Sequence, residues 1–182
     1  MRVLGCPNRV TLRTAALASL LAIAGCAPSS VPPGAPAPEA DGWHEFSGTW
    51  TAVGDRHAIH LGSERRASIA EFNGTLLLAG SSRPGVGFHA NALVFNDSAT
   101  GMVGRAIWTD EHGDQLYSEL RGDGTATGNK IQGTFVGGTG RYSGAQGEYA
   151  FSWRFVLESE EGAVQGQADG LTGRVRAAAK SS

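Results

Sequence analysis

The chain of 182 residues contains few cysteines and few charged residues, and each shortage excludes a class of protein. Two cysteines are too few for a disulfide framework. Charged residues make up 18% and hydrophobic residues 41%, which is too apolar for a wholly disordered chain. No convincing amphipathic helix is found, and the apolar segment 15–24 is too short to cross a bilayer as a stable helix. The length is too small for several full domains.

Residues 1–25 have the pattern of a secretory signal peptide. Arg2, Arg9 and Arg13 form a basic start without acidic residues, and the apolar segment follows. It ends in Ile23-Ala24-Gly25-Cys26, which resembles the lipobox of bacterial lipoproteins. The resemblance implies cleavage before Cys26, a diacylglycerol on its thiol and an acyl chain such as palmitate on the new amino group. The alternative is an ordinary signal peptide with a chance cysteine.

A lipid on Cys26 would fix where the protein resides. Two or three acyl chains, at about 0.8 kcal/mol per buried methylene, anchor a protein stably in a membrane. We therefore expect a lipid-anchored protein of the bacterial cell envelope, and the lipoprotein resemblance implies the outer membrane if the cell is Gram-negative. Removing the signal leaves 12 basic against 17 acidic residues, a formal charge of −5, which argues against a nucleic-acid partner.

Proline marks the boundary of the folded part. Five of the seven prolines lie in 27–41, so we expect 26–41 to be the lipidated cysteine and a disordered, extended tether. Residues 42–176 form the predicted β domain, and 177–182 a disordered tail. Short apolar runs separated by Gly, Asn and Asp predict nine strands, at 46–53, 56–61, 67–79, 87–96, 101–109, 115–121, 129–136, 148–158 and 163–175.

These runs predict an all-β fold, a single antiparallel barrel of eight or nine strands. A barrel of this size is filled by side chains or holds one small ligand. In 148–158, Tyr149, Phe151, Trp153, Phe155 and Leu157 alternate with smaller or polar residues and so share one face. The candidate pocket or barrel-core residues are the large aromatic ones: Trp50, Trp108, Tyr149, Phe151, Trp153 and Phe155.

Two segments, 76–78 and 92–95, are apolar on both faces. This predicts that another subunit covers part of the outer wall.

The glycine-rich segment 131–147 carries a family resemblance. We expect Gly137, Gly138, Gly140 and Gly144 to be structural turn positions, and Tyr142 to cap the barrel end. The Gly-Gly-Thr-Gly and Gly-Ala-x-Gly stretches resemble those of allene-oxide-cyclase and dirigent-like barrels. The resemblance implies an eight-stranded, calycin-like barrel, often trimeric. No catalytic or ligand-binding residue of those families can be matched to this chain.

Groups that could carry chemistry are few. His57 and His60 would point to opposite faces of a strand, so they do not form a metal pair. The acidic segment 110–114 could hold a hard cation, but a solvated hairpin turn is favoured. A cluster of Arg105, Tyr117 and Glu119 would serve acid–base chemistry if it faced inward, and the outward orientation is favoured. We predict no catalytic residue, no metal site and no cofactor.

Three functions fit these patterns. The favoured one is a binding or scaffold module for a small apolar ligand or an envelope partner. The second is an enzyme of the cyclase or isomerase kind, which rests on the family resemblance alone. The third is a ligand-free structural protein of the envelope. An apolar pocket favours the first, a pocket with a buried, paired acid the second, and a filled interior the third.

Overall fold

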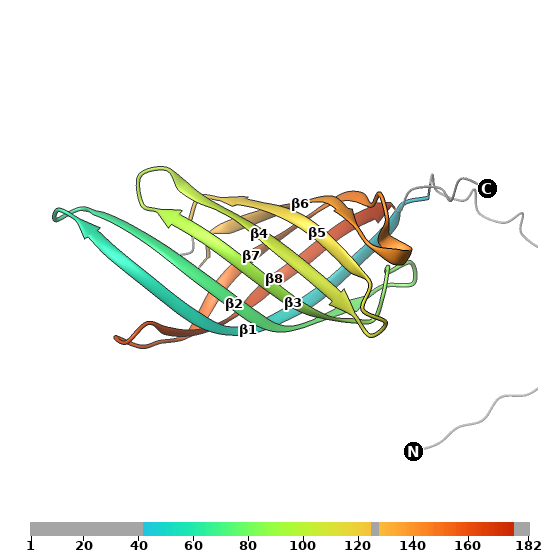
Figure 1. The fold of residues 1–182 in the computed structure, drawn as a ribbon, viewed down its shortest axis with the longest axis horizontal. Coiled ribbons are helices and arrows are strands. Elements are labelled where there is room, and N and C mark those ends of the chain that lie inside the picture. The colour runs from blue at the N-terminus through green and yellow to red at the C-terminus, as the bar shows by residue number, and fades with distance from the viewer. Residues whose placement is uncertain (1–41, 125–127, 177–182) are drawn as a thin grey trace, which may run out of the picture. The chain divides into compact units, whose positions relative to one another are not determined.

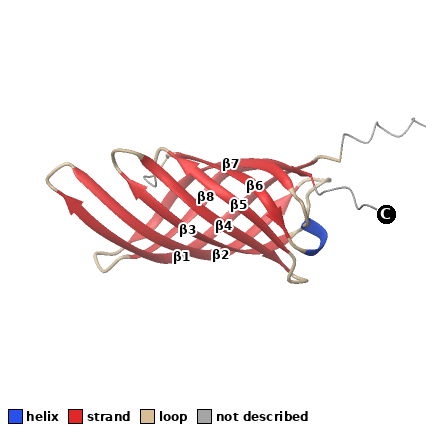
Figure 2. Ribbon diagram, turned by 45° about the horizontal axis from the view of Figure 1, so that its top comes forward, coloured by secondary structure: helices blue, strands red, loops and turns tan. Residues whose placement is uncertain are grey.

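The computed structural model describes residues 42–124 and 128–176, which form a closed antiparallel barrel (Figures 1 and 2). Each strand pairs with the next in the chain, and β8 pairs with β1 to close the barrel. A short 3-10 turn, η1 (Gly140–Tyr142), precedes β7. The strands are β1 (His44–Leu61), β2 (Arg65–Ala79), β3 (Gly87–Asp97), β4 (Gly101–Asp110), β5 (Gln115–Gly122), β6 (Lys130–Gly138), β7 (Gln146–Glu158) and β8 (Ala163–Arg176).

The predicted all-β barrel of eight or nine strands is confirmed, and it has eight strands. The expected strands 46–53 and 56–61 are one continuous strand, β1. Gly54, in the gap between these two ranges, pairs with Phe72 on β2 and Val164 on β8. A Cβ atom on Gly54 would lie 1.8 Å from the carbonyl oxygen of Glu71, so glycine is needed here because two strands approach closely. The predicted signal, Cys26, tether and tail lie outside the described residues.

Aromatic rings fill the barrel. Trp50, Trp108, Tyr149, Phe151 and Trp153 are all buried, and Phe155 is partly buried and packs against the same core. Ring centroids lie 4.7 Å apart between Trp108 and Tyr149, and 4.9 Å apart between Phe72 and Trp153. Fully burying one such side chain stabilises the fold by about 1.5–3 kcal/mol, so these rings are a main apolar source of stability.

Little space is left between the rings. Two internal cavities have volumes of about 10 and 20 Å³. A single water molecule needs roughly 10–15 Å³, whereas pockets for small organic ligands span about 300–1,000 Å³. Neither cavity can therefore admit a small apolar ligand in this conformation.

The end of β7 departs from simple alternation. Leu157, expected on the inner face with Tyr149 and Trp153, has 50% of its surface exposed. The pairing of β7 with β8 shifts by one residue between Phe155 and Leu157, as in a β-bulge. Because side chains alternate with a period of two, this shift turns Leu157 out of the barrel.

The outer wall is partly apolar, as the sequence predicts. Leu76 and Leu78 are buried while Leu77 between them is exposed. On β3, Leu93 and Phe95 point outward. Phe95 is paired with Ile69 on β2 and with Val103 on β4, and all three of these side chains are exposed. They form a short apolar row across three neighbouring strands.

Candidate functional site

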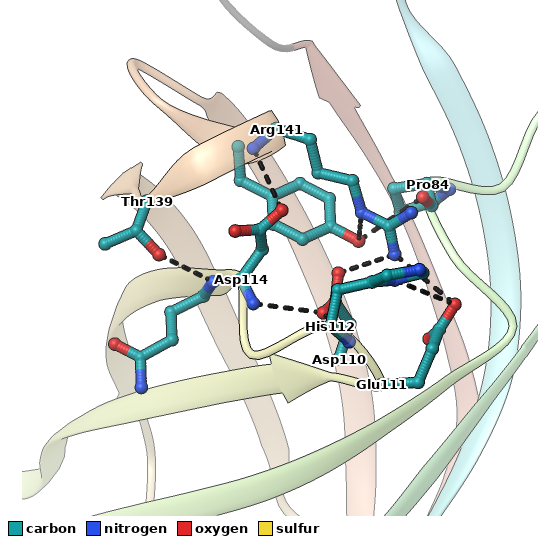
Figure 3. Close-up of polar contacts among 9 residues, drawn as sticks. Pro84, Asp110, Glu111, His112, Asp114, Thr139 and Arg141 are labelled. Atoms are coloured by element: carbon teal, nitrogen blue, oxygen red, sulfur yellow. Dashed lines mark hydrogen bonds and ion pairs between the residues drawn. The ribbon is translucent and has the colours of Figure 1, made fainter.

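A polar cluster closes the barrel end that carries η1 (Figure 3). Asp110, the last residue of β4, has a side chain with no exposed surface. Its Oδ1 accepts hydrogen bonds from the backbone N–H groups of His112 (2.8 Å) and Asp114 (3.0 Å). Its Oδ2 lies 2.5 Å from a terminal guanidinium nitrogen of Arg141, which η1 supplies. The carboxylate is therefore held from its own turn and from a distant segment.

Tyr142 extends this network to a third segment. The Nε of Arg141 donates to the Tyr142 hydroxyl at 2.9 Å, and that hydroxyl donates to the carbonyl of Pro84 at 3.4 Å. The Tyr142 ring is buried, with its centroid 5.9 Å from that of Phe88 in the core. The Arg141 guanidinium lies 5.1 Å from the Tyr142 ring centroid. Tyr142 thus covers this end of the barrel and bonds to the loop between β2 and β3.

The environment keeps Asp110 ionised. Burial by itself raises the pKa of Asp110, but the N–H groups of His112 and Asp114, together with Arg141, outweigh it and leave the pKa below its usual range. Burial raises the pKa of Tyr142, so its phenol stays protonated. A carboxylate with a lowered pKa and committed oxygens is poorly suited to proton transfer near neutral pH. We interpret the cluster as a structural brace.

Among the described residues, a group of side chains that could bind a metal ion lies in the same turn. Ligand atoms of Asp110, Glu111 and His112 lie within 4.8 Å of one another. Arg141, however, lies 2.5 Å from Asp110 Oδ2 and 3.8 Å from Glu111 Oε1. A guanidinium in this position supplies the positive charge that a cation would bring and repels a divalent ion. The geometry favours a hairpin turn over a cation site, as the sequence indicates, but Asp110 itself is buried and only 111–113 are exposed to solvent.

The four turn glycines lie around this brace. Gly140 has φ = +51°, and a Cβ atom there would lie 1.8 Å from Oδ1 of Asp114. Gly137 and Gly144 also have positive φ, of 150° and 67°. A Cβ on Gly138 would lie 2.3 Å from the carbonyl oxygen of Gln115. Glycine at these positions lets η1 fold closely onto the turn after β4.

The other candidate groups lie on the surface. Arg105 and Glu119 face outward and form an ion pair at 3.1 Å, so they do not build an acid–base cluster inside the barrel. Tyr117 donates to Gln115 Oε1 at 2.9 Å. His57 and His60 are exposed and lie on opposite faces of β1. His89 is exposed on the outer wall of β3.

A buried polar pair escaped the sequence analysis. Ser118 Oγ and the Tyr149 hydroxyl are 2.8 Å apart inside the barrel. Burial raises the pKa of Tyr149, and the hydrogen bond to Ser118 opposes that rise. One signal was available: Ser118 lies between Leu116 and Leu120 at the inward positions of an alternating strand. A hydroxyl at such a position predicts a partner inside the core.

Two open grooves lie on the outside of the barrel. The larger, about 780 Å³, runs over β1, β6, β7 and β8 and is lined mostly by polar side chains, including Glu148 and Arg174, which form an ion pair at 2.7 Å. The smaller, about 590 Å³, lies over β1, β2 and β8 and includes Asp55 and Glu71. None of the four cavities described is lined by Asp110 or Arg141.

These features define the class as a small closed antiparallel β-barrel with an aromatic, filled interior. No family model and no curated protein matches the chain. Among solved structures it is similar to the pterocarpan synthase dirigent protein GePTS1, with 13% identity and a TM-score of 0.41 over 76% of this chain and 90% of that chain. A likeness at this level assigns no activity. Within the described residues, no helix has the length and apolar character needed to cross a membrane.

Proposed function

We propose that this protein is a lipid-anchored module of the bacterial envelope that acts through the outside of its barrel. The filled interior is the observation that carries this proposal. With cavities of about 10 and 20 Å³, the barrel core is used for stability. The surface left for recognition is the outer wall, including the apolar row of Ile69, Phe95 and Val103. The filled interior favours a ligand-free structural protein over a carrier of a small apolar ligand, and the exposed apolar row favours one that also serves as a scaffold for an envelope partner.

The enzyme alternative gains no support from this geometry. Two carboxylates are buried and paired: Asp110, with Arg141 and two backbone N–H groups as partners, and Asp97, with Arg65 as partner. Neither lines any of the four cavities described. The remaining charged groups described above face solvent.

The occupancy of the barrel is tested by native mass spectrometry of the protein purified from its own host. We expect the mass of the acylated polypeptide with no further bound compound. A small apolar molecule that reproducibly co-purifies with the protein would show that the interior opens, and would contradict a role confined to the outer surface.

The anchor is tested separately by Cys26→Ser in the full chain. Only a thiol can carry the thioether-linked lipid, so the serine variant should move from the membrane fraction to the soluble fraction. Ala27→Ser is the matched control, because it changes the neighbouring residue and leaves the thiol. Unchanged membrane retention of the Cys26→Ser variant would contradict lipid anchoring.

The partner surface is tested by photo-crosslinking in the host. A crosslinking amino acid at Leu93, exposed between the paired residues Glu71 and Arg105, should give a discrete adduct. The same crosslinking amino acid at Thr51, an exposed residue of β1, serves as the control. Equal crosslinking at both positions, or none at either, would contradict the binding of a partner to the apolar part of the outer wall.

A further inference from the structure

Strand β1 extends beyond its partner on one side. Its pairing with β8 ends at Asp55 and Ala163, followed by one hydrogen bond from the Arg56 N–H to the Gly162 carbonyl at 2.8 Å. Its pairing with β2 continues to Leu61 and Arg65. Within the described residues, 57–61 therefore have a strand on the β2 side alone. Figure 1 shows this hairpin tip projecting away from the turn between β7 and β8.

The open edge carries backbone groups ready for pairing. The N–H of Arg56 points toward β8, and successive residues of a strand point their backbone groups to alternate edges. Ala58 and His60 consequently direct an N–H and a C=O each toward the side where β8 has ended. These four groups can form hydrogen bonds with an additional strand, as the backbone groups of any open sheet edge can.

The hairpin is held firmly on its other side. Arg65 binds the Asp97 carboxylate at the end of β3 through two hydrogen bonds, of 3.1 and 2.6 Å. Ser98 donates its N–H to the Arg66 carbonyl at 3.0 Å, and its Oγ accepts from the Arg66 N–H at 3.0 Å. The open edge is thus preorganised, so pairing with it costs less conformational entropy.

This edge lacks the usual protection. Natural edge strands are blunted by charged side chains or proline, yet residues 57–63 contain neither. Ile59 has 60% and Leu61 47% of its surface exposed. Both lie on the outer face of the sheet, and Ile69 is exposed on the neighbouring strand β2.

We propose that a second copy of this chain pairs with this edge, β1 against β1 in antiparallel orientation, with Ile59 opposite Ile59. In this register Ala58 faces His60 of the second copy, and His60 faces Ala58 of the second copy. The two-fold axis relates the two pairs, so the N–H and C=O groups of both residues find hydrogen-bond partners in each copy. His57 faces Leu61 on the outer side. The four central strands then form one continuous sheet across the two molecules.

The sequence around Ile59 favours a second copy over an unrelated strand. The open window runs from 57 to 61, and β1 itself ends at Leu61. In this register Leu61 of the second copy faces His57, so its strand ends one residue before Arg56, which already bonds to Gly162. No two charged residues of like sign face each other. At the end of the window Arg56 already forms an ion pair with Glu158, so it presents no uncompensated charge to the second copy.

Cysteine crosslinking in the full chain tests both the contact and its register. Ile59 is the non-hydrogen-bonded pair at the two-fold axis, where Cα atoms lie about 4.5 Å apart, within the range that a disulfide needs. Ile59→Cys should give a dimer on a non-reducing gel after mild oxidation. Leu61→Cys is the matched control, because its equivalents are offset by four residues, about 13 Å. The unchanged chain controls for Cys6 and Cys26.

We expect at least fivefold more dimer from Ile59→Cys than from Leu61→Cys, and dimer again when His57→Cys and Leu61→Cys chains are co-expressed. Adding Ala58→Pro to Ile59→Cys removes an N–H at the open edge without removing one from the β2 ladder, and should lower the dimer yield about fivefold or more. Equal yields from positions 59 and 61, no dimer from either, or adducts only with a different protein would overturn the proposal.

Discussion

The ring of Tyr149 occupies the space that a side chain on Gly133 would need. The two residues face each other on β7 and β6, and a Cβ atom on Gly133 would lie 2.1 Å from Cζ of Tyr149. Tyr149 in turn contacts Trp108 and Phe135, with ring centroids 4.7 and 5.0 Å apart. The glycine is therefore part of the aromatic core, because its missing side chain makes room for the ring.

Gly133→Ala should destabilise the domain by about 1–3 kcal/mol, since overpacking forces the Tyr149 ring and its neighbours to shift. Urea unfolding followed by tryptophan fluorescence measures this. Gly87→Ala is the control, because a Cβ there meets nothing closer than 3.6 Å and the residue lies at the start of β3. Equal losses of unfolding free energy in the two variants would show that the close contact between Gly133 and the Tyr149 ring does not matter for stability.

Ser118→Ala and Tyr149→Phe should each lower stability by about 1 kcal/mol, because each breaks the buried hydrogen bond of 2.8 Å and leaves the remaining hydroxyl without this partner. The double variant should lose less than the sum of the two. A double-mutant cycle of unfolding free energies measures the coupling. Strict additivity would mean that the two hydroxyls do not stabilise each other.

Asp110→Asn should destabilise the domain by about 2 kcal/mol at pH 7. The variant keeps the shape of the side chain but removes the charge that faces Arg141 and two backbone N–H groups. The expected loss is below that of a fully buried ion pair because Arg141 keeps 39% of its side-chain surface exposed. Asp123→Asn, at an exposed residue just after β5, is a surface control that should have little effect.

The Asp110 carboxyl also gives a prediction for acid. Its folded-state pKa is lowered, chiefly by hydrogen bonds that overcome the opposing effect of burial. Its stabilisation is therefore present above the unfolded-state pKa of about 4 and is lost as the pH falls through the folded-state value. The difference in unfolding free energy between the unchanged chain and Asp110→Asn should shrink between pH 6 and pH 2. A constant difference would contradict this linkage.

Trp153→Ala should cost about 3–5 kcal/mol and leave a cavity where the indole packed against Phe72. The enlarged space should bind indole, which would raise the midpoint of thermal unfolding of the variant and leave that of the unchanged chain unaffected. Trp43→Ala, at a half-buried residue just before β1, is the matched control. Binding of indole to the unchanged chain would contradict a filled interior.

Much of the barrel could be predicted because its signals are local. The alternation of aromatic residues in 148–158 indicates a half-buried strand wherever that segment lies in the fold, and β7 spans Gln146–Glu158. The continuity of β1 through Gly54 could not be predicted, because glycine marks both turns and close approaches of strands, and only the neighbouring strand distinguishes them. Leu157 was misplaced because a bulge depends on the pairing register, which a single strand does not encode.

The brace at the barrel end was predictable only in part. The acidic turn at 110–114 and the capping position of Tyr142 follow from residue types and spacing. The contact between Asp110 and Arg141 does not, because it joins two turns that are far apart in the chain and meet only when the barrel closes. Ser118 shows the same limit, since an inward hydroxyl predicts a partner without naming Tyr149.

The closure of the barrel by β1 and β8 has a practical consequence. Because His44 and Val175 are cross-strand partners, the first and last strands start and finish side by side. A short peptide could join them, and the chain could be reopened in the turn at Gly113 to give a circular permutant with every ladder intact. A fluorescent reporter inserted after Arg176 would lie near the start of β1, leaving the hairpin between β1 and β2 at the opposite end unobstructed.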